Sequence, residues 1–277
     1  MWTPVCLARA RPVAAALAGR AEAAPNLPDF ASASFVPGAA VNNPYFPLLD
    51  TMTRVYTGTD DDGVVDRFEL QVVGAGPVIL GVQTVARRDR AYSNARLDED
   101  TFDYYAQDSA GNVWYMGEDV TNYRYDSAGR LVGTDSASAW RGGINGALPG
   151  YAMPAQLSVG QHHYQEFAAA DAALDNASTT AIGVTRQLAV GSFADVVQVF
   201  EASELDPDAR EFKYYARGFG LVRVEEGFGT DLVNPALTVD FVGVAAAVPE
   251  PSAWALMAMG IAGIAALRRR AAQALSR

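Results

Sequence analysis

The middle of the chain, Tyr45–Val244, consists of short runs in which side-chain character changes with a period of two. In Val64–Val73 apolar residues alternate with polar ones, and the same alternation recurs in Glu211–Arg217. Successive side chains of a β-strand point to opposite faces, so this period predicts half-buried strands. Two further runs, Val78–Ala86 and Val196–Phe200, are apolar on both faces and β-branched, which is typical of central strands.

Turn signals rich in Asp and Gly separate these runs. They are Asp60–Gly63, Gly74–Pro77, Asp108–Gly111 and Asp126–Gly129. Their spacing suits antiparallel hairpins rather than crossover helices, and no stretch carries an apolar stripe at helical period over three turns. The sequence therefore predicts an all-β fold over residues 45–244: a single curved antiparallel meander sheet, either a partly open barrel or a sandwich. Residues 25–44 form a Pro-rich lead-in.

A short sequence phrase occurs twice. Thr101–Ala106 and Glu211–Ala216 both contain Phe-x-Tyr-Tyr-Ala, 110 positions apart. One interpretation is a duplicated half, which would give two similar sheets around one core. The other is coincidence, because aromatic pairs suit hairpin strands in general. We favour coincidence at this point, because only this short stretch matches.

The chain is acidic. Its 277 residues include 21 basic and 32 acidic side chains, a formal net charge of −11. Arginines near both termini offset part of the imbalance, so the middle is more acidic than the total shows. An acidic surface repels phosphate backbones, and we therefore expect no nucleic-acid partner. The single cysteine, Cys6, has no disulfide partner and no zinc-binding spacing.

The first 24 residues fit an export signal. Arg9 and Arg11 supply a basic start, Val13–Gly19 a short apolar run, and Ala21–Ala23 an A-x-A-like cleavage site. The apolar run is at the lower limit of length, and charged residues are unusual so near the cut. The alternatives are a disordered leader rich in Ala and Arg, and a misplaced start codon.

The C-terminal region holds an apolar run without any charged side chain, Ala253–Leu267, followed directly by three arginines. A core helix of a soluble domain would show a polar face at a period of 3.6 residues, and this run shows none. As a helix it would measure about 22 Å, and snorkelling arginine stems would bridge part of the gap to a hydrocarbon layer of about 30 Å. We expect a transmembrane helix and arginine cluster at 253–270 and a cytoplasmic tail at 271–277; the alternative is a buried hydrophobic helix.

An extended segment accessible to a protease precedes this run, because its two prolines lack amide donors and disfavour helix. The order of Pro-Glu-Pro, apolar span and arginine cluster resembles the PEP-CTERM sorting signal of bacterial exosortase substrates. The matching residues are Pro249, Glu250 and Pro251 in a linker at 245–252, and Arg268, Arg269 and Arg270 as the stop-transfer cluster. The resemblance implies export, transient anchoring in the inner membrane, processing by an exosortase-type sorting peptidase, and release to the cell surface or extracellular matrix.

Three phrases in the middle of the chain resemble an uncharacterised family of secreted bacterial β-proteins. They are Asn43–Pro47, Asp103–Glu118 and Tyr214–Glu226. This resemblance implies a secreted β-protein and no particular reaction. In shape, such a fold would be analogous to the half-barrel cups of periplasmic lipoprotein carriers, which hold acyl chains.

Candidates for catalysis or metal binding are few. Adjacent His162 and His163 would point to opposite faces of a strand and would not easily share a metal ion, and no G-x-S-x-G context supports a Ser-His-Asp triad. Asp60–Gly63 is similar to a calcium loop, but Gly58 occupies the first ligand position, which favours a hairpin turn. Loose calcium binding around Asp98–Asp100 stays open. Acidic residues are so numerous that any proposed glycosidase pair is uninformative.

Aromatic residues gather on runs expected to be neighbouring strands. Exposed rings would stack on sugars or line an apolar cup, whereas buried rings would be core and cross-strand pairs, which we expect for most of them. The residues are Trp114, Tyr115, Tyr104, Tyr105, Tyr123, Tyr125, Tyr214 and Tyr215.

Together these patterns predict an exported, non-enzymatic surface or matrix protein that acts by binding or by structural association with extracellular polysaccharide. We assign no catalytic, cofactor-binding or metal-binding residue and expect no cofactor. One alternative is a periplasmic or surface carrier of a hydrophobic ligand in a β-cup, which requires a large apolar cavity. A weaker alternative is a polysaccharide-acting hydrolase, which requires two carboxylates facing each other in a cleft. A concave face filled by side chains would count against both.

Overall fold

The computed structural model describes residues 26–229 and 232–245, and all structural statements below concern these residues. By its internal contacts the chain divides into two units, Met1–Val244 and Ala245–Arg277, and the described structure belongs almost wholly to the first. The predicted export signal (1–24), transmembrane helix and arginine cluster (253–270), C-terminal tail (271–277) and nearly all of the PEP linker lie outside the described residues. Among the described residues, no helix combines the length and the apolar character needed to cross a membrane.

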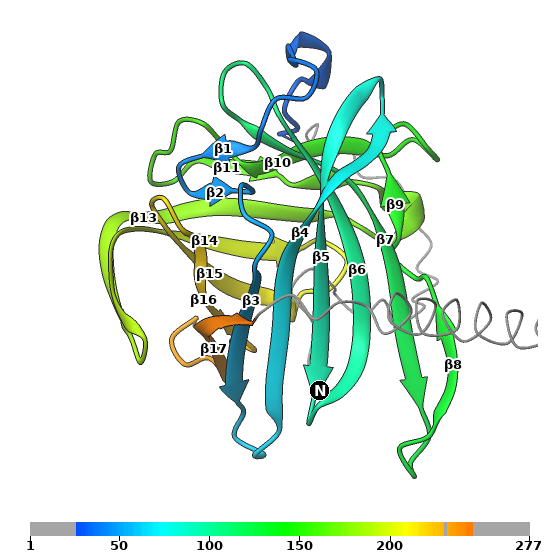
Figure 1. Cartoon of the computed structure of the whole chain (residues 1–277), viewed down its shortest axis with the longest axis vertical. Coiled ribbons are helices and arrows are strands. Elements are labelled where there is room, and N and C mark those ends of the chain that lie inside the picture. The colour runs from blue at the N-terminus through cyan, green and yellow to red at the C-terminus, as the bar shows by residue number, and fades with distance from the viewer. Residues whose placement is uncertain (1–25, 230–231, 246–277) are drawn as a thin grey trace, which may run out of the picture. The chain divides into compact units, whose positions relative to one another are not determined.

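The described residues form seventeen strands and two short 3₁₀-helices, η1 (Phe30–Ser32) and η2 (Ala169–Asp171) (Figure 1). The strands are β1 (Asn42–Asn43), β2 (Phe46–Pro47), β3 (Thr53–Thr59), β4 (Val65–Ile79), β5 (Val82–Ser93), β6 (Arg96–Gln107), β7 (Val113–Tyr125), β8 (Leu131–Asp135), β9 (Trp140–Arg141), β10 (Leu148–Met153), β11 (His162–Tyr164), β12 (Glu166–Phe167), β13 (Asp175–Leu188), β14 (Gly191–Ser203), β15 (Arg210–Ala216), β16 (Gly220–Glu226) and β17 (Leu237–Ala245).

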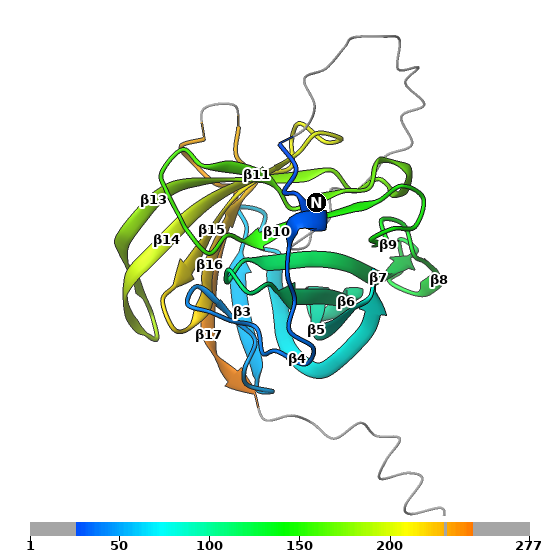
Figure 2. The same cartoon turned by 90° about the horizontal axis from the view of Figure 1, so that it is seen from above.

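Fifteen of the strands belong to one sheet, and β1 and β2 form a small separate hairpin. The order in the large sheet is β11-β13-β14-β15-β16-β17-β3-β4-β5-β6-β7-β10-β12, with β8 and β9 also paired to β7. The path starts at β11 and ends at β12, which are neighbours in sequence, so the sheet nearly closes on itself (Figure 2). The predicted all-β antiparallel fold is confirmed as one nearly closed sheet. The chain-order meander is interrupted where β17, the last strand, lies between β16 and β3.

The predicted strands at Val64–Val73, Val196–Phe200 and Glu211–Arg217 correspond to β4, β14 and β15. Three of the four predicted turns are also present. In each of these three turns a glycine with positive φ donates its amide to the aspartate carbonyl three residues earlier, as a hairpin turn requires. They are Asp60–Gly63, Asp108–Gly111 and Asp126–Gly129.

Two expectations about β4 and β5 are wrong. The run Val78–Ala86 is not one central strand, because Ile79 pairs with Val82 across a two-residue turn, Leu80–Gly81. Both turn residues have positive φ, 48° and 81°, which matches the twist of a tight hairpin. The predicted turn Gly74–Pro77 instead lies within β4, where two register shifts against β5 mark irregularities of the β-bulge kind. Glycine marked a bulge here rather than a chain reversal.

The repeated Phe-x-Tyr-Tyr-Ala phrase occupies equivalent places in two four-stranded meanders, β4–β7 and β13–β16. The register of β6 against β7 shifts between Tyr104 and Tyr105, and that of β15 against β16 shifts between Tyr214 and Tyr215. The preceding hairpins, β4–β5 and β13–β14, both close with two-residue turns. Agreement in register and in bulge position favours a duplicated half over coincidence, contrary to the interpretation that we favoured from sequence.

Buried apolar side chains from many strands of the sheet pack together in one large core. The ring of Tyr56 on β3 stacks on that of Phe68 on β4, with centroids 4.4 Å apart, and both side chains are fully buried. A second cluster surrounds Trp114 on β7. The ring of Phe30, from the N-terminal lead-in, lies nearly perpendicular to the Trp114 ring, with centroids 5.2 Å apart. The lead-in is therefore part of the packed structure and covers one side of the sheet.

Candidate functional site

Charged side chains lie inside the first half of the sheet, on β5, β6 and β7. Arg87 Nη2 donates to Asp103 Oδ2 and to the Tyr105 hydroxyl, each at 2.8 Å. The Tyr115 hydroxyl lies 2.8 Å from Asp103 Oδ1 and 2.9 Å from Glu118 Oε2. The hydroxyl has one proton, so these two carboxyl groups share a single donor. Burial raises the pKa of Glu118 well above its ordinary value.

The second half of the sheet holds a similar group of buried charged side chains, but here the cation, Lys213, lies on the strand that carries the repeated phrase. Lys213 Nζ on β15 lies 2.5 Å from Glu201 Oε2 and 3.0 Å from Glu211 Oε1. Tyr215 donates its hydroxyl to Glu201 Oε1 at 3.4 Å. Burial raises the pKa of Glu211 to about 7. Lys213 holds the place on β15 that Asp103 holds on β6, one residue after the Phe that begins the repeated phrase.

Two further carboxyl groups lie where the ends of the sheet approach each other, Glu166 on β12 and Asp175 on β13. The amide of Gln165, the residue before Glu166, donates to the carbonyl of Asp175 at 2.8 Å. Burial raises the pKa of Glu166 well above its ordinary range and that of Asp175 to about 6. A hydrogen bond from Ser203 opposes part of the rise at Asp175.

The carboxyl groups of Asp89 on β5 and Glu99 on β6 are also buried inside the sheet. Among the described residues, Asp89 Oδ2 and Glu99 Oε2 have no hydrogen-bond partner, although Thr101 donates to the other oxygen of Glu99 at 2.7 Å. Burial raises the pKa of each carboxyl to about 8. Burial thus favours the uncharged form of both carboxyl groups.

Two small cavities adjoin this polar interior, and the ring of Phe46 on β2 borders both. The inner cavity, of about 30 Å³, is lined by the charged and tyrosine side chains described above, including Arg87, Glu166 and Lys213. The outer cavity, of about 40 Å³, opens beside β3. Each holds a few water molecules at most, whereas binding pockets for organic ligands usually measure about 300 Å³ or more.

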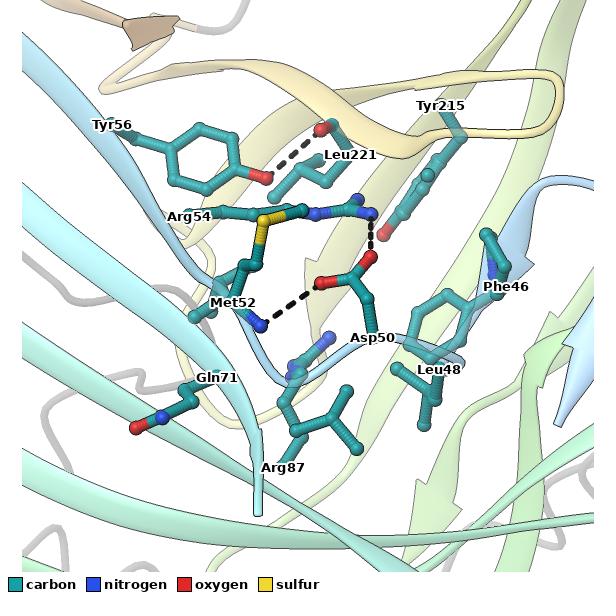
Figure 3. A pocket seen from close by; sticks show the side chains of 14 residues that line it. Phe46, Leu48, Asp50, Met52, Arg54, Tyr56, Gln71, Arg87, Tyr215 and Leu221 are labelled. Atoms are coloured by element: carbon teal, nitrogen blue, oxygen red, sulfur yellow. Dashed lines mark hydrogen bonds and ion pairs between the residues drawn. The ribbon is translucent and has the colours of Figure 1, made fainter. Parts of the chain in front are cut away.

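Figure 3 shows the outer cavity, where the Asp50 carboxylate is held between the Arg54 guanidinium, at 2.9 Å, and the Met52 amide, at 3.1 Å. The Tyr56 hydroxyl donates to the carbonyl of Leu221 at 2.9 Å. The polar groups at the rim are thus engaged with the protein itself. Aliphatic and ring surfaces make up most of the remaining wall.

The two histidines lie on opposite faces of β11, as predicted: His162 is exposed and His163 is buried. Burial lowers the pKa of His163 to about 4, so its ring is neutral. The ring packs 6.1 Å from that of Tyr151. Within the described part of the chain, no group of three or more His, Cys, Asp or Glu side chains is arranged to hold a metal ion.

The two acidic segments considered for calcium, the turn Asp60–Gly63 and Asp98–Asp100 within β6, form contacts inside the fold. Asp60 Oδ1 accepts from the amides of Asp62 and Val64, at 3.0 and 2.8 Å, which is the capping of a hairpin turn. In the second segment, Asp100 accepts two hydrogen bonds from Arg88, at 2.7 and 2.6 Å, and Glu99 is buried on the opposite face of β6. The turn interpretation of Asp60–Gly63 is therefore confirmed.

Most of the aromatic candidates are core residues. Six of the eight are buried, and Tyr123 and Tyr125 on β7 are half-buried. The Tyr125 hydroxyl donates to the carbonyl of Leu97 at 2.7 Å, and Arg96 lies over its ring. This agrees with the expectation that most of these rings form core and cross-strand pairs.

The polar interior was not predicted from the sequence, yet a signal for it exists. Arg87 and Asp89 on β5, and Asp103 and Tyr105 on β6, recur at a period of two within long strands. Such alternation is normally taken to mark the solvent face. In a nearly closed sheet of fifteen strands, the inner face offers more room than apolar side chains alone occupy, and paired charges are accommodated there.

Comparison with known proteins places a sorting signal at the C-terminus. Residues 247–270 match the PEP-CTERM protein-sorting motif. The match includes Pro249, Glu250 and Pro251 and extends to Arg270, so the predicted resemblance is confirmed at these positions. The chain thus carries a signal of the kind that directs export and processing by an exosortase, a membrane peptidase.

The rest of the chain has no close relative among the proteins compared. No curated protein matches the sequence. A crystal structure described as a putative lipoprotein from Parabacteroides distasonis is similar to it with a TM-score of 0.36 and 12% identity, over 73% of this chain and 99% of that one. This likeness is too distant to bear on fold or function.

Proposed function

We propose that this chain is an exported surface or extracellular-matrix protein, anchored transiently in the inner membrane and processed by an exosortase. Its β domain acts without catalysis, by binding or by structural association. The observation that carries the proposal is the match of residues 247–270 to a PEP-CTERM motif. Extracellular polysaccharide is the partner class that this sorting route suggests.

The non-enzymatic part of the proposal is supported by the small size of the two cavities beside the buried carboxyl groups. A glycoside hydrolase must bring two carboxyl groups to opposite sides of a sugar in an open cleft. Glu166 and Asp175 instead both border a cavity of about 30 Å³, which has no room for a sugar ring. The Lys213–Glu201 pair is likewise buried, with side chains only 4% and 6% exposed.

The same volumes count against a carrier of hydrophobic ligands. An acyl chain needs a long apolar cavity, and the outer cavity of about 40 Å³ accommodates little more than the end of one. The inner cavity is lined by charged groups, whose contact with an acyl chain would cost desolvation. Cavities of this size suit a structural or surface-binding role better than a carrier.

Sorting is tested by intact-mass measurement and fractionation of the native protein in cells with and without the sorting peptidase. We expect a shortened product outside the inner membrane only when the peptidase is present. Simultaneous replacement of Pro249, Glu250 and Pro251 by alanine should leave an unshortened, membrane-associated chain, whereas Val36→Ala, at an exposed site (60%) in the lead-in, should be processed normally. A cytosolic product that retains Arg268 to the end of the chain would refute the proposed sorting.

The role of the domain is tested separately by co-sedimentation of the processed protein with the polysaccharide matrix of the same cells. Retention in the matrix fraction, lost after enzymatic removal of the polysaccharide, would support structural association. Release of sugars by the purified protein would contradict the non-enzymatic assignment. Correct sorting together with a freely soluble product would refute association with the matrix and leave export intact.

A further inference from the structure

The last strand of the described chain, β17, ends at Ala245, at the corner of the sheet where β3 begins. The two strands are neighbours in the sheet (Figure 2). A Cβ at Gly58 on β3 would lie 2.3 Å from the carbonyl oxygen of Thr238 on β17. Two residues earlier on β3, the Tyr56 ring lies 5.6 Å from that of Phe241, which is three residues later on β17. The strands therefore run antiparallel, and the end of β17 lies beside the start of β3.

Exposed apolar side chains gather around this corner. Two belong to the segment that leads into β3, and two to the last residues of β17. One more is on β4, which continues alongside the segment before β3, since Gln71 Nε2 donates to the carbonyl of Thr51 at 3.2 Å. Isolated exposed apolar residues are ordinary, whereas a group of them marks a contact surface. The five residues, which we call the exit rim, are Leu49, Met52, Val73, Val242 and Val244, and they are 41–62% exposed.

The ionic groups beside the exit rim occur in pairs. Asp50 accepts a hydrogen bond from Arg54 at 2.9 Å, and Arg54 also donates to the carbonyl of Phe219 in the turn between β15 and β16. Next to that turn, Arg217 lies 3.7 Å from Asp195. These pairs are neutral, whereas the whole chain has a formal net charge of −11. This corner therefore approaches a bilayer without the repulsion that unpaired acidic groups meet at anionic headgroups.

The sorting signal follows the end of β17 almost at once. Its match begins at residue 247, two residues after Ala245. The apolar run predicted to span the membrane starts at Ala253, eight residues after Ala245, and eight fully extended residues reach at most about 29 Å. A compact domain of about 220 residues is about 45 Å across. Because the tether is shorter than the domain is wide, an anchored domain has to keep this corner towards the bilayer.

We propose that the exit rim contacts the surface of the lipid bilayer while the chain is anchored, an inference that rests on the anchoring proposed above. The apolar side chains enter the interfacial region, and the ion pairs beside them stay among the headgroups. Five partly exposed side chains bind a bilayer weakly by themselves, and the short tether supplies the high effective concentration that keeps them there. Cleavage near the sorting motif removes this advantage, so the processed acidic domain leaves the membrane.

The contact is tested on the full-length chain with one fluorescent probe. Cys6→Ser removes the only thiol of the sequence, and Leu49→Cys then carries an environment-sensitive label on the exit rim. The labelled chain is reconstituted into phosphatidylcholine vesicles with and without brominated acyl chains, and flotation of the vesicles reports anchoring. We expect brominated lipid to quench the probe by about twofold or more, because bromine quenches only within a short distance of the acyl chains.

Two further labelled variants provide the comparison. Val242→Cys places the probe on β17 and should be quenched as strongly, and it decides alone if the Leu49 variant does not fold. Val159→Cys is the matched control, at a side chain that is 65% exposed in the connection between β10 and β11. That connection belongs to another part of the fold, since Gly160 donates its amide to the carbonyl of Thr179 on β13. We expect no quenching at Val159.

The outcomes separate the exit rim from the anchor. Unquenched probes at both rim positions, in a chain that floats with the vesicles, would overturn the rim contact and leave anchoring intact. A chain that does not float would refute anchoring and the rim contact with it. An emission shift without quenching by bromine would indicate burial against protein, such as a second copy of the chain, and would overturn the lipid contact. Equal quenching at Val159 would show that the domain has no preferred face towards the bilayer.

Discussion

Tyr105 and Tyr215 hold the same position in the two halves of the sheet, and both contact the ring of Phe46. The centroid of the Phe46 ring lies 5.0 Å from that of Tyr105 and 6.0 Å from that of Tyr215. Each tyrosine directly follows the register shift of its own strand. Phe46 comes from the separate β1–β2 hairpin, so one side chain outside the sheet links the two meanders at their equivalent sites.

Replacing Phe46 by alanine should therefore destabilise the whole domain. The ring is 6% exposed, and loss of a buried phenylalanine typically costs about 3 kcal/mol or more of unfolding free energy. The change would also join the inner and outer cavities, which share this ring as a wall. Urea unfolding followed by circular dichroism measures the effect.

The control for this variant is Val36→Ala, at a side chain that is 60% exposed. It should change the unfolding free energy by less than about 0.5 kcal/mol. A loss for Phe46→Ala as small as that of the control would mean that Phe46 does not link the two halves.

The interior ion pair predicts a second outcome. Lys213→Ala leaves the carboxylates of Glu201 and Glu211 without their shared cation. Breaking a buried pair in this way costs about 3–5 kcal/mol, because an uncompensated charge stays buried. Arg124→Ala, which removes an ion pair to Asp135 from a 66% exposed side chain, should cost less than about 1 kcal/mol.

Thermal unfolding of both variants beside the wild type gives this comparison. Lys213→Met, which keeps much of the side-chain length without the charge, should be no more stable than Lys213→Ala if the lost charge dominates. Recovery of wild-type stability by methionine would show that packing, rather than charge, is what Lys213 supplies.

The strands themselves were largely predictable, because hairpins depend on local signals. Asp60–Gly63 was identified as a turn from its own residues, and the alternation in Val64–Val73 marked its strand. The error at Gly74–Pro77 has a physical cause: glycine permits both a chain reversal and a bulge, and only the pairing with β5 distinguishes them. Closure of the sheet through β17 and β3 depends on a contact between distant parts of the chain, which no local pattern encodes.

The two kinds of site differ in the same way. The PEP-CTERM motif is contiguous, so its residues could be named from the sequence and were then matched at 247–270. The polar interior is assembled from strands far apart in sequence, such as β5 for Arg87 and β15 for Lys213. Charged residues at a period of two would lie outside on an open sheet, and only closure of the sheet turns them inward.

The buried carboxyl groups predict that the domain is more stable in mild acid than in alkali. The native pKa values of Asp89 and Glu99 are about 8, whereas unfolded carboxyl groups titrate near about 4. Their contribution to stability is fully present below about pH 4 and is lost as the pH rises through about 8. The melting temperature should therefore fall steadily between pH 5 and pH 9, as measured by calorimetry.

Glu99→Gln should flatten this dependence, because an amide does not ionise. Asp61→Asn, at an exposed turn residue, should leave the slope unchanged. A melting temperature that rises between pH 5 and pH 9 would contradict burial of these carboxyl groups in the native state.

The junction between β3 and β17 predicts a steric effect. A Cβ added at Gly58 on β3 would lie 2.3 Å from the carbonyl oxygen of Thr238 on β17, so Gly58→Ala must push these neighbouring strands apart. We expect a loss of about 2 kcal/mol or more in unfolding free energy, with faster exchange of the β17 amides. Gly133 on β8 is the matched control, because a Cβ there meets nothing within 4 Å and its φ is not positive. Gly133→Ala should be neutral or slightly stabilising, and equal effects of the two substitutions would show that the β3–β17 contact is not close in the folded protein.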